Sequence, residues 1–376
     1  MVVAVAVEAA EDAEVAVTDL YCSNQSRLLL QFHITGRCNL RCKHCYRMEG
    51  DVEPLSYDDV ISVVEQYKEL RKEYNTRHQI RRRGHINITG GEPFFRKDIK
   101  EILRYLGENK EEFSYGVLSN GSFLNEELVA VLKETEVSFV QLSIDGDRAM
   151  HDELRAPGDY DRVLKSAAYL EKNGIRTYIS FTANKDNYKY LPQVAAECRK
   201  RKITKLWSDR LVPIGNGEEI KALAITDKDL PDYVATMKKA RGGFWTRLLH
   251  PKTQVTMNRA LQFLYSDGAM YSCSAGNSLI TVDEFGMVMP CRRMPIPCGS
   301  VLDSSLKEIY YNNETLKSLR GCFEPEECRN CNYVYYCKGG AKCQSYAACG
   351  SFYRADPACP YCEGKKGEGV ELPNRK

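Results

Sequence analysis

Short runs of branched and aromatic residues alternate along the first part of the chain with longer segments that have apolar positions at helical spacing. The short runs are bounded by Gly, Asn or Asp, as β-strands commonly are. In the segment 161–170, Val163, Leu164, Ala167 and Leu170 share one helical face. The pattern predicts strands at 28–35, 85–89, 115–119, 139–144, 177–182 and 205–212, with helices between them that include 57–72, 97–106, 125–134, 160–173 and 191–201.

Alternating strands and helices indicate right-handed βαβ units, and therefore an α/β fold with a parallel sheet. Six units fit a curved, partial (β/α)6 barrel of the TIM type, where chemistry takes place at the C-terminal ends of the strands. A doubly wound sheet would show the same alternation. The predicted regions are an N-terminal extension (1–26), the barrel (27–222), a bridging helical segment (223–270), a Cys-rich domain (271–363) and a flexible tail (364–376).

The amino-acid composition limits the classes of molecule that we expect this protein to bind. The chain has 376 residues, 43% of them hydrophobic, which is enough for a large core. Its 53 basic and 51 acidic residues give a net charge of +2, so we expect no nucleic-acid partner and no membrane partner. Acidic residues interrupt the apolar start of the chain, which excludes a signal peptide there. We therefore expect a cytoplasmic protein with reduced thiols.

Cysteine is the unusual feature of the composition. Of the 16 cysteines, 11 lie between Cys273 and Cys362. Disulfides would be the alternative to metal ligation, but a chain of this length needs no covalent staples, and we expect a reducing compartment. The cysteines are therefore predicted to bind metal.

The first cysteine group follows the first predicted strand, with Cys38, Cys42 and Cys45 spaced Cys-x3-Cys-x2-Cys. Three thiolates on one loop can each bind one iron of a cubane, which leaves the fourth iron without a protein ligand. Such an open position lets another molecule bind the metal directly. A zinc site would need a fourth ligand, and the nearby His44 is expected to point away.

Further motifs end the next strands: Thr89-Gly90-Gly91-Glu92-Pro93, then Ser119-Asn120-Gly121, then Leu142-Ser143-Ile144-Asp145-Gly146. Alone, each is an ordinary turn or helix cap. In this order behind the cysteine loop, residues 27–215 resemble the radical S-adenosylmethionine (SAM) superfamily. The resemblance implies one catalytic [4Fe–4S] cluster on the three cysteines. It also implies a SAM site formed by Tyr46, Gly90, Gly91, Glu92, Asn120, Ser143, Arg155 and Leu211.

The resemblance assigns roles within that site. The main chain of the Gly-Gly-Glu-Pro motif, together with Glu92, would hold the amino group of SAM, and glycines let the main chain come close to a ligand. Ser143 and Arg155 would contact its carboxylate. Asn120 and Thr182 would reach ribose or substrate, and Leu211 or Val212 would pack against adenine.

The C-terminal cysteines have a pattern of their own. Cys273 is followed by Gly286-x4-Cys291, and later by Cys328-x2-Cys331-x5-Cys337-x5-Cys343. This resembles the SPASM extension of radical SAM enzymes, which carries two auxiliary clusters, although the last x5 spacing is x3 in that family. The resemblance implies one cluster on Cys273, Cys291 and Cys343, and a second on Cys328, Cys331, Cys337 and one of Cys349, Cys359 or Cys362.

Some assignments stay open at this level. Cys298 and Cys322 are candidates for a fourth ligand of the first auxiliary cluster, which otherwise has an open iron. Cys22 and Cys198 lie outside both groups, and Cys198 reads as a buried apolar residue on a helix. A zinc-ribbon-like module is the alternative for the whole C-terminal group.

The resemblance implies reductive cleavage of SAM to a 5′-deoxyadenosyl radical that abstracts hydrogen from a substrate, with an electron donor such as flavodoxin or ferredoxin. SPASM proteins most often modify ribosomally made peptides by crosslinks, thioethers or epimerisation, so a peptide is the expected substrate, with a separate leader-peptide-binding protein as a further partner. Arg292 follows Cys291, at the position where sulfatase maturases have an Asp that acts as a base. This difference argues against formylglycine formation.

Two alternatives to peptide modification remain. Arg292 and Arg293 would bind carboxylates, which also suits a small molecule such as a tetrapyrrole. A zinc-bearing binding protein without radical chemistry is the remote alternative. The sequence leaves open the substrate, the bond formed, its stereochemistry and the oligomeric state.

Overall fold

The computed structural model describes residues 27–47, 55–266, 270–321 and 324–362. The predicted extension at 1–26 and tail at 364–376 lie outside the described residues, as do Cys22 and Cys322. None of the helices within these ranges combines the length and the apolar character that crossing a membrane requires.

Six parallel strands form the centre of the sheet in chain order, and they confirm the six predicted runs. They are β1 (Leu29–His33), β2 (Gly84–Thr89), β3 (Phe113–Leu118), β4 (Val140–Ser143), β5 (Thr177–Ala183) and β6 (Lys205–Arg210). Neighbours pair in parallel register, for example with Leu30 opposite Ile86. Every residue of β2 is buried, as expected for a parallel sheet covered on both faces.

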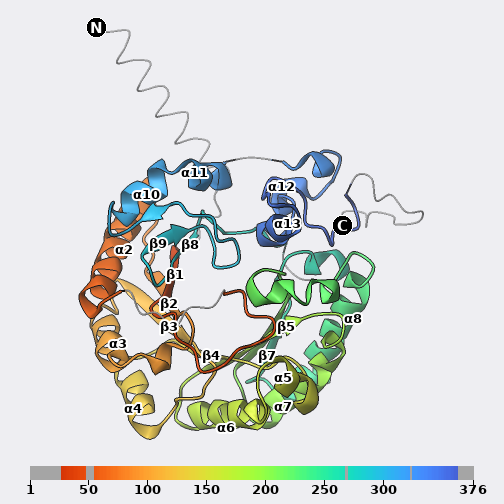
Figure 1. Cartoon of the computed structure of the whole chain (residues 1–376). Coiled ribbons are helices and arrows are strands. Elements are labelled where there is room, and N and C mark those ends of the chain that lie inside the picture. The colour runs from red at the N-terminus through yellow and green to blue at the C-terminus, as the bar shows by residue number, and fades with distance from the viewer. Residues whose placement is uncertain (1–26, 48–54, 267–269, 322–323, 363–376) are drawn as a thin grey trace.

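Helices surround the outer face of this sheet, as Figure 1 shows in a view along the strands. The predicted ones are α2 (Tyr57–Arg77), α3 (Ile99–Glu108), α4 (Glu126–Glu134), α6 (Asp159–Lys172) and α7 (Leu191–Lys200). The apolar face expected on α6 is buried against the sheet. A short helix that the pattern did not predict, α5 (Arg148–Leu154), follows β4. The structure therefore has the expected partial barrel, with helices outside and strands inside.

The sheet continues beyond the six predicted strands on both sides. β7 (Gln254–Thr256) pairs in parallel with β6, and β8 (Leu279–Val282) pairs in parallel with β1. β9 (Met287–Met289) and β10 (Gly299–Ser300) add antiparallel strands next to β8. The segment 223–270, expected to be helical, thus holds a strand besides α8 (Leu230–Arg241) and α9 (Phe244–Leu249). Three residues are too few for a strand pattern to show in sequence.

The C-terminal elements close the ring at the top of Figure 1. They are α10 (Leu306–Asn312), α11 (Glu314–Arg320), α12 (Val334–Cys337) and α13 (Lys342–Cys349). Short 3-10 helices occur at Pro93–Phe95, Tyr188–Tyr190, Gly215–Glu218, Lys221–Leu223, Gln262–Tyr265 and Glu326–Cys328.

Several hydrogen bonds attach this region to the barrel. The Leu306 amide donates to Gln66 on α2, at 2.8 Å. On the other side, Arg210 donates two hydrogen bonds to the fully buried Asp356, at 2.9 and 2.5 Å. The C-terminal region is thereby held against both sides of the sheet.

Candidate active site

A cavity of about 220 Å³ lies at the C-terminal ends of the barrel strands, where the fold places chemistry. Its wall combines the loop after β1, the ends of β2 to β6 and the loop that carries Arg292. Every residue predicted for the catalytic cluster and the SAM site lines this cavity except Glu92. Arg292 and Arg293 line it as well. The tertiary structure therefore brings together residues from segments that are far apart in the sequence.

The three barrel cysteines lie on one tight turn. The Cys45 amide donates to the Cys42 carbonyl at 3.1 Å, and the Leu40 amide donates to the Cys38 sulfur at 3.5 Å. Burial raises the pKa of Cys38, and it raises the pKa of Cys42 to about 11. These thiols are therefore protonated near neutral pH without a metal, and metal binding there releases protons.

The three thiols can be compared with what a cubane cluster needs. A cubane distributes its cysteine ligands over several irons. All three thiols face one cavity and interact electrostatically, an arrangement that fits such a cluster.

The two glycines after β2 allow a close backbone approach to the cysteine loop. A Cβ on Gly90 would lie 2.3 Å from the Thr35 carbonyl oxygen, and one on Gly91 would lie 2.1 Å from that of Arg37. Gly90 also has φ of 138°, which favours glycine. The Gly91 amide donates to Thr35 at 2.9 Å. The glycines thus serve packing of the cysteine loop as well as access to the cavity.

Glu92 lies beneath the cavity. Its fully buried carboxylate accepts hydrogen bonds from the Ser119 hydroxyl at 2.8 Å, the Asn120 backbone N–H at 2.7 Å and the Phe94 backbone N–H at 3.1 Å. Burial raises its pKa to about 7 despite these three donors. The side chain ties the end of β2 to the end of β3. It positions the neighbouring main chain and does not itself face the cavity.

A buried charged group stands beside Cys42. The Arg155 Nε donates to Asp145 at 2.6 Å, and its Nη1 lies 3.8 Å from the Cys42 sulfur. His44 was expected to point away from the site, but its Nε2 lies 3.3 Å from Asp145 and 3.2 Å from Arg155. Burial lowers the pKa of His44 to about 4, so it is neutral. The carboxylate of Asp145 therefore orients a permanent cation toward the cysteine loop.

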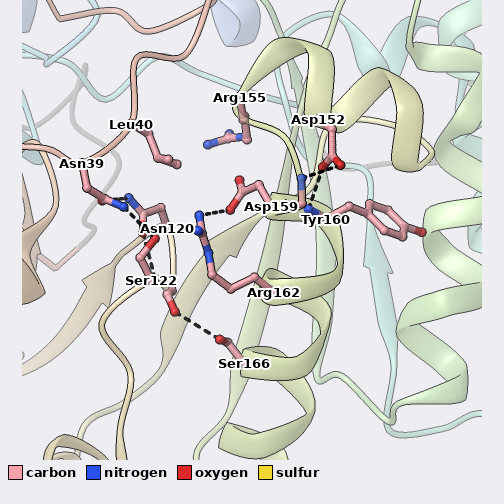
Figure 2. A network of polar contacts seen from close by, with 12 residues as sticks. Asn39, Leu40, Asn120, Ser122, Asp152, Arg155, Asp159, Tyr160, Arg162 and Ser166 are labelled. Atoms are coloured by element: carbon pink, nitrogen blue, oxygen red, sulfur yellow. Dashed lines mark hydrogen bonds and ion pairs between the residues drawn. The ribbon is translucent and has the colours of Figure 1, made fainter.

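Asn120 connects the end of β3 to the cysteine loop. Its side-chain nitrogen Nδ2 donates to the Asn39 side chain at 2.9 Å and lies 3.9 Å from the Cys38 sulfur. Figure 2 shows Asn39 held between Asn120 and Ser122. Ser143, also predicted for the site, shares a hydrogen bond with Ser180 at 3.1 Å inside the cavity.

Sequence reasoning missed several lining residues on β6 and its neighbours. Trp207 and Asp209 alternate with buried residues along β6, so they face the barrel interior together with Leu211. The Trp207 indole donates to Gln141 on β4 at 3.1 Å. The period-two pattern of this strand was the available signal, because alternate side chains of a barrel strand point inward.

The two arginines after Cys291 differ in their contacts. Arg293 donates to Asp209 at 2.9 Å and is thus engaged within the protein. The Arg292 guanidinium lies over the Tyr46 ring at 5.3 Å and lines the cavity. Arg292 forms no ion pair with another described residue. Of the two, Arg292 therefore has the guanidinium that a bound anion could pair with.

The C-terminal cysteines form two groups. In one, Cys343 interacts electrostatically with Cys291 and Cys273, and burial raises its pKa strongly. All three pack in a small apolar cluster that also contains Phe352. The Arg293 amide donates to the Cys291 sulfur at 3.5 Å. Despite the extra residues before it, Cys343 lies with the two cysteines predicted to be its partners.

The second group gathers around Cys337, which interacts electrostatically with Cys331 and Cys359. Cys359 in turn is hydrogen-bonded to Cys362. Cys349 lies apart: it is exposed, and its thiol donates to the Ser345 carbonyl at 3.2 Å. Of the three candidates for the last ligand, the structure therefore places Cys359 and Cys362 with the group.

Two other cysteines have no cysteine neighbour in the described structure. Cys298 is buried, its thiol donates to the Ile296 carbonyl at 3.4 Å, and burial raises its pKa to about 12. Cys198 is a fully buried residue of α7, as expected from the sequence. Cys298 is thus a poor candidate for a cluster ligand, and the other spare candidate, Cys322, lies outside the described residues.

Comparison with known proteins agrees with this arrangement. A sequence profile of the Radical SAM superfamily matches residues 32–198, and one of SPASM, an iron-sulfur cluster-binding domain, matches 265–332. The AdoMet-dependent heme synthase of Oleidesulfovibrio alaskensis is 27% identical over 367 residues, covering 90% of this chain and 88% of that protein. The mycofactocin maturase MftC of Mycolicibacterium smegmatis is 24% identical over 347 residues, covering 88% and 82%.

A solved structure shares the fold. Streptococcus suis SuiB bound to S-adenosylmethionine superposes with a TM-score of 0.68 at 17% identity, covering 94% of this chain and 81% of that one. The likeness extends over the barrel and the C-terminal region together. The chain therefore contains a Radical SAM domain followed by a SPASM iron-sulfur cluster-binding domain, and it is an enzyme that binds S-adenosylmethionine and iron–sulfur clusters.

Proposed function

We propose that this enzyme cleaves SAM at a [4Fe–4S] cluster held by Cys38, Cys42 and Cys45, and abstracts hydrogen from a substrate whose carboxylate pairs with Arg292. When bound, the cluster supplies the electron that converts SAM to methionine and a 5′-deoxyadenosyl radical. The observation that supports the proposal most strongly is that three thiols of one loop face the same cavity as an arginine that forms no ion pair with any described residue.

The surrounding residues would position the reactants. Arg155, held by Asp145, places a cation beside Cys42, where it lowers the cost of gathering negative charge on the thiolates. Asn120 and Ser143 present polar groups to the cavity. Leu211 and Val212 form a buried apolar wall that keeps water from the reacting carbon.

For the substrate we place a tetrapyrrole side chain ahead of a peptide, reversing the order that the sequence suggested. The heme synthase relative is more similar to this chain than the peptide maturase relative, over a larger share of both proteins. Propionate side chains of a porphyrin are carboxylates of the kind that Arg292 can bind. A peptide with an acidic residue or a free C-terminus is the second candidate, which the similarity to the maturase keeps open.

Oxidative decarboxylation would convert a propionate side chain to a vinyl group. One hydrogen atom would pass from the carbon next to the ring to the 5′-deoxyadenosyl radical, which becomes 5′-deoxyadenosine and leaves a radical on that carbon. The bond to the carboxylate then breaks, carbon dioxide leaves, a vinyl double bond forms, and one electron passes to an acceptor. An auxiliary cluster on Cys273, Cys291 and Cys343 would be that acceptor, and Cys291 directly precedes the substrate-binding arginine.

The test is anaerobic turnover of the reconstituted enzyme with SAM, dithionite and iron coproporphyrin, a porphyrin with propionate side chains. We expect 5′-deoxyadenosine and a product that has lost carbon dioxide and two hydrogens, both measured by mass spectrometry. Arg292→Gln should lower kcat/KM about 10- to 100-fold, because a charge-assisted hydrogen bond is lost, and Arg292→Lys should restore part of it. Arg104→Gln, a surface change on α3, is the matched control and should have no effect.

Two outcomes would count against this proposal. An unmodified porphyrin, together with a mass change in a short peptide encoded beside this protein, would move the assignment to peptide modification. Equal kcat/KM values for the wild type and Arg292→Gln would remove the carboxylate-binding role.

A further inference from the structure

The short helix α9 has its apolar side facing solvent. Phe244, Trp245, Leu248 and Leu249 are between 56 and 72% exposed. At 100° per residue these four positions cover one side of the helix. Thr246, on the other side, is half-buried and packs on the turn at Gly242. An ordinary surface helix buries its apolar side and exposes its polar side, so α9 is inverted.

The sequence around α9 is strongly basic. The segment 238–252 contains Lys238, Lys239, Arg241, Arg247 and Lys252, and it has no Asp or Glu. Lys252 pairs with Glu171 at 3.0 Å. The other four form no ion pair within the part of the chain that the structure describes. A local excess of positive charge therefore accompanies the exposed apolar side, although the net charge of the whole chain is only +2.

This surface lies at the end of the barrel opposite the active site. α9 directly precedes β7, whose first residue Gln254 is paired with Lys205 at the start of β6. The parallel strands therefore begin on the side of α9 and end at the cavity. Arg81 and Arg82 are exposed just before the start of β2, which places further cations at the same end.

We propose that α9 is a membrane-docking element that places the enzyme on an anionic lipid surface, with the apolar side of α9 in the interface and the cations at the headgroups. Trp and Phe prefer the interface between headgroups and acyl chains, and flanking Lys and Arg attract anionic lipids. The chain would lie on the bilayer and not span it. The active-site mouth would face away from the membrane, accessible to an electron donor.

The distribution of charge decides between a lipid surface and a second copy of the chain. In a twofold-symmetric dimer the same patch meets itself, so the cations around α9 would face each other. An anionic bilayer supplies the opposite charge. The expectation of no membrane partner rested on the net charge of the whole chain, which does not report how charge is distributed.

The test is co-sedimentation of the reconstituted full-length enzyme with vesicles of phosphatidylcholine containing phosphatidylglycerol. We expect binding that weakens as salt rises, with Trp245 fluorescence shifted to the blue. Leu248→Ser and Leu249→Ser should each lower the partition coefficient about tenfold. Arg247→Glu should lower it by more than about fivefold, through loss of one cation and gain of one anion. Trp245→Phe should still bind but lose the fluorescence shift.

Leu302→Ser is the matched control, because Leu302 is 59% exposed, compared with 56% for Leu248, but lies between β10 and α10. It should leave binding unchanged. Equal binding by the α9 variants and the wild type would overturn the proposal. So would an absence of vesicle binding accompanied by a dimer in analytical ultracentrifugation that Leu248→Ser dissociates, since α9 would then be a subunit interface. 5′-Deoxyadenosine formation measured alongside separates loss of docking from loss of the fold.

Discussion

The cysteine loop of the barrel and the C-terminal cysteine region bring their cysteines together in different ways. In the barrel, Cys38, Cys42 and Cys45 lie within one turn after β1. In the C-terminal region, Cys273 and Cys291 come from loops around β8 and β9, and Cys343 comes from α13. A local loop can be formed from spacing alone, whereas the distributed group exists only when the surrounding segments have folded together.

The two regions share their local chemistry. The Cys38 and Cys291 sulfurs each accept an amide hydrogen from the residue two positions on, at 3.5 Å in both cases. Each region also has an arginine held by a carboxylate, with the buried Asp145 holding Arg155 and the partly buried Asp209 holding Arg293. Amide donors and nearby cations stabilise thiolates. Cys298 and Cys349 instead donate to carbonyl oxygens, which marks them as ordinary thiols.

The largest expected effect comes from removing a cysteine of the barrel loop, compared with removing a cysteine of the C-terminal region. Cys42→Ala should reduce 5′-deoxyadenosine formation to the level of the cluster-free protein, because one cluster ligand is lost. Cys331→Ala should spare SAM cleavage more than it spares product formation. Both products are measured in the same anaerobic assay. Turnover by Cys42→Ala would contradict the proposed site, and equal loss of both products in folded Cys331→Ala would contradict an auxiliary role.

Iron content tests which cysteines belong to the second C-terminal group. Cys359→Ser should lower the iron bound per chain by roughly a third, since one of the three proposed four-iron clusters would lose a ligand. Cys349→Ser should leave it unchanged, because that thiol lies apart from the group. Iron and sulfide analysis after reconstitution gives the comparison. Loss of iron in Cys349→Ser would assign the ligand to that residue.

The attachment between the two regions is the third target. Asp356→Asn removes the partner of the buried Arg210, and an uncompensated buried charge costs about 3–5 kcal/mol of stability. We expect a lower Tm and weaker iron binding by the C-terminal cysteines, with less change in the barrel cluster. The matched control is Glu327→Gln, which breaks a pair with the exposed Arg354 and should cost less than about 1 kcal/mol. Equal effects of the two changes would show that the buried pair has no special role.

The smallest effect concerns Glu92 and pH. Its pKa is about 7 in the folded protein, against an ordinary 4.5, so the folded chain binds more protons between these values. The contribution of Glu92 to the free energy of unfolding is therefore full below pH 4.5 and falls as pH rises through 7, by on the order of 3 kcal/mol. Denaturant unfolding of cluster-free wild type and Glu92→Gln at several pH values measures it. The stability of the wild type relative to Glu92→Gln should fall as pH rises from 4.5 to 7, so a relative stability of the wild type that rises with pH would contradict the assigned shift.

The sequence by itself determined the six strands with their intervening helices and the cysteine loop that follows the first strand. Both depend on short-range patterns: strand and helix periodicities read over about ten residues, and three cysteines within eight positions of each other. The motifs at the ends of successive strands were equally readable, because parallel strands bring their C-terminal ends to one edge whatever the details of packing.

Only the tertiary structure decided which C-terminal cysteines meet, because residues such as Cys291 and Cys343 are 52 positions apart and their approach depends on packing. It also decided that the Glu92 carboxylate bonds to the end of β3 and that Arg293 pairs with Asp209 while Arg292 faces the cavity. The tertiary structure likewise decided that α9 turns its apolar side outward. A periodicity reports that a side is apolar, and a spacing reports that a contact is feasible. The direction in which a side chain points is set by what packs around it.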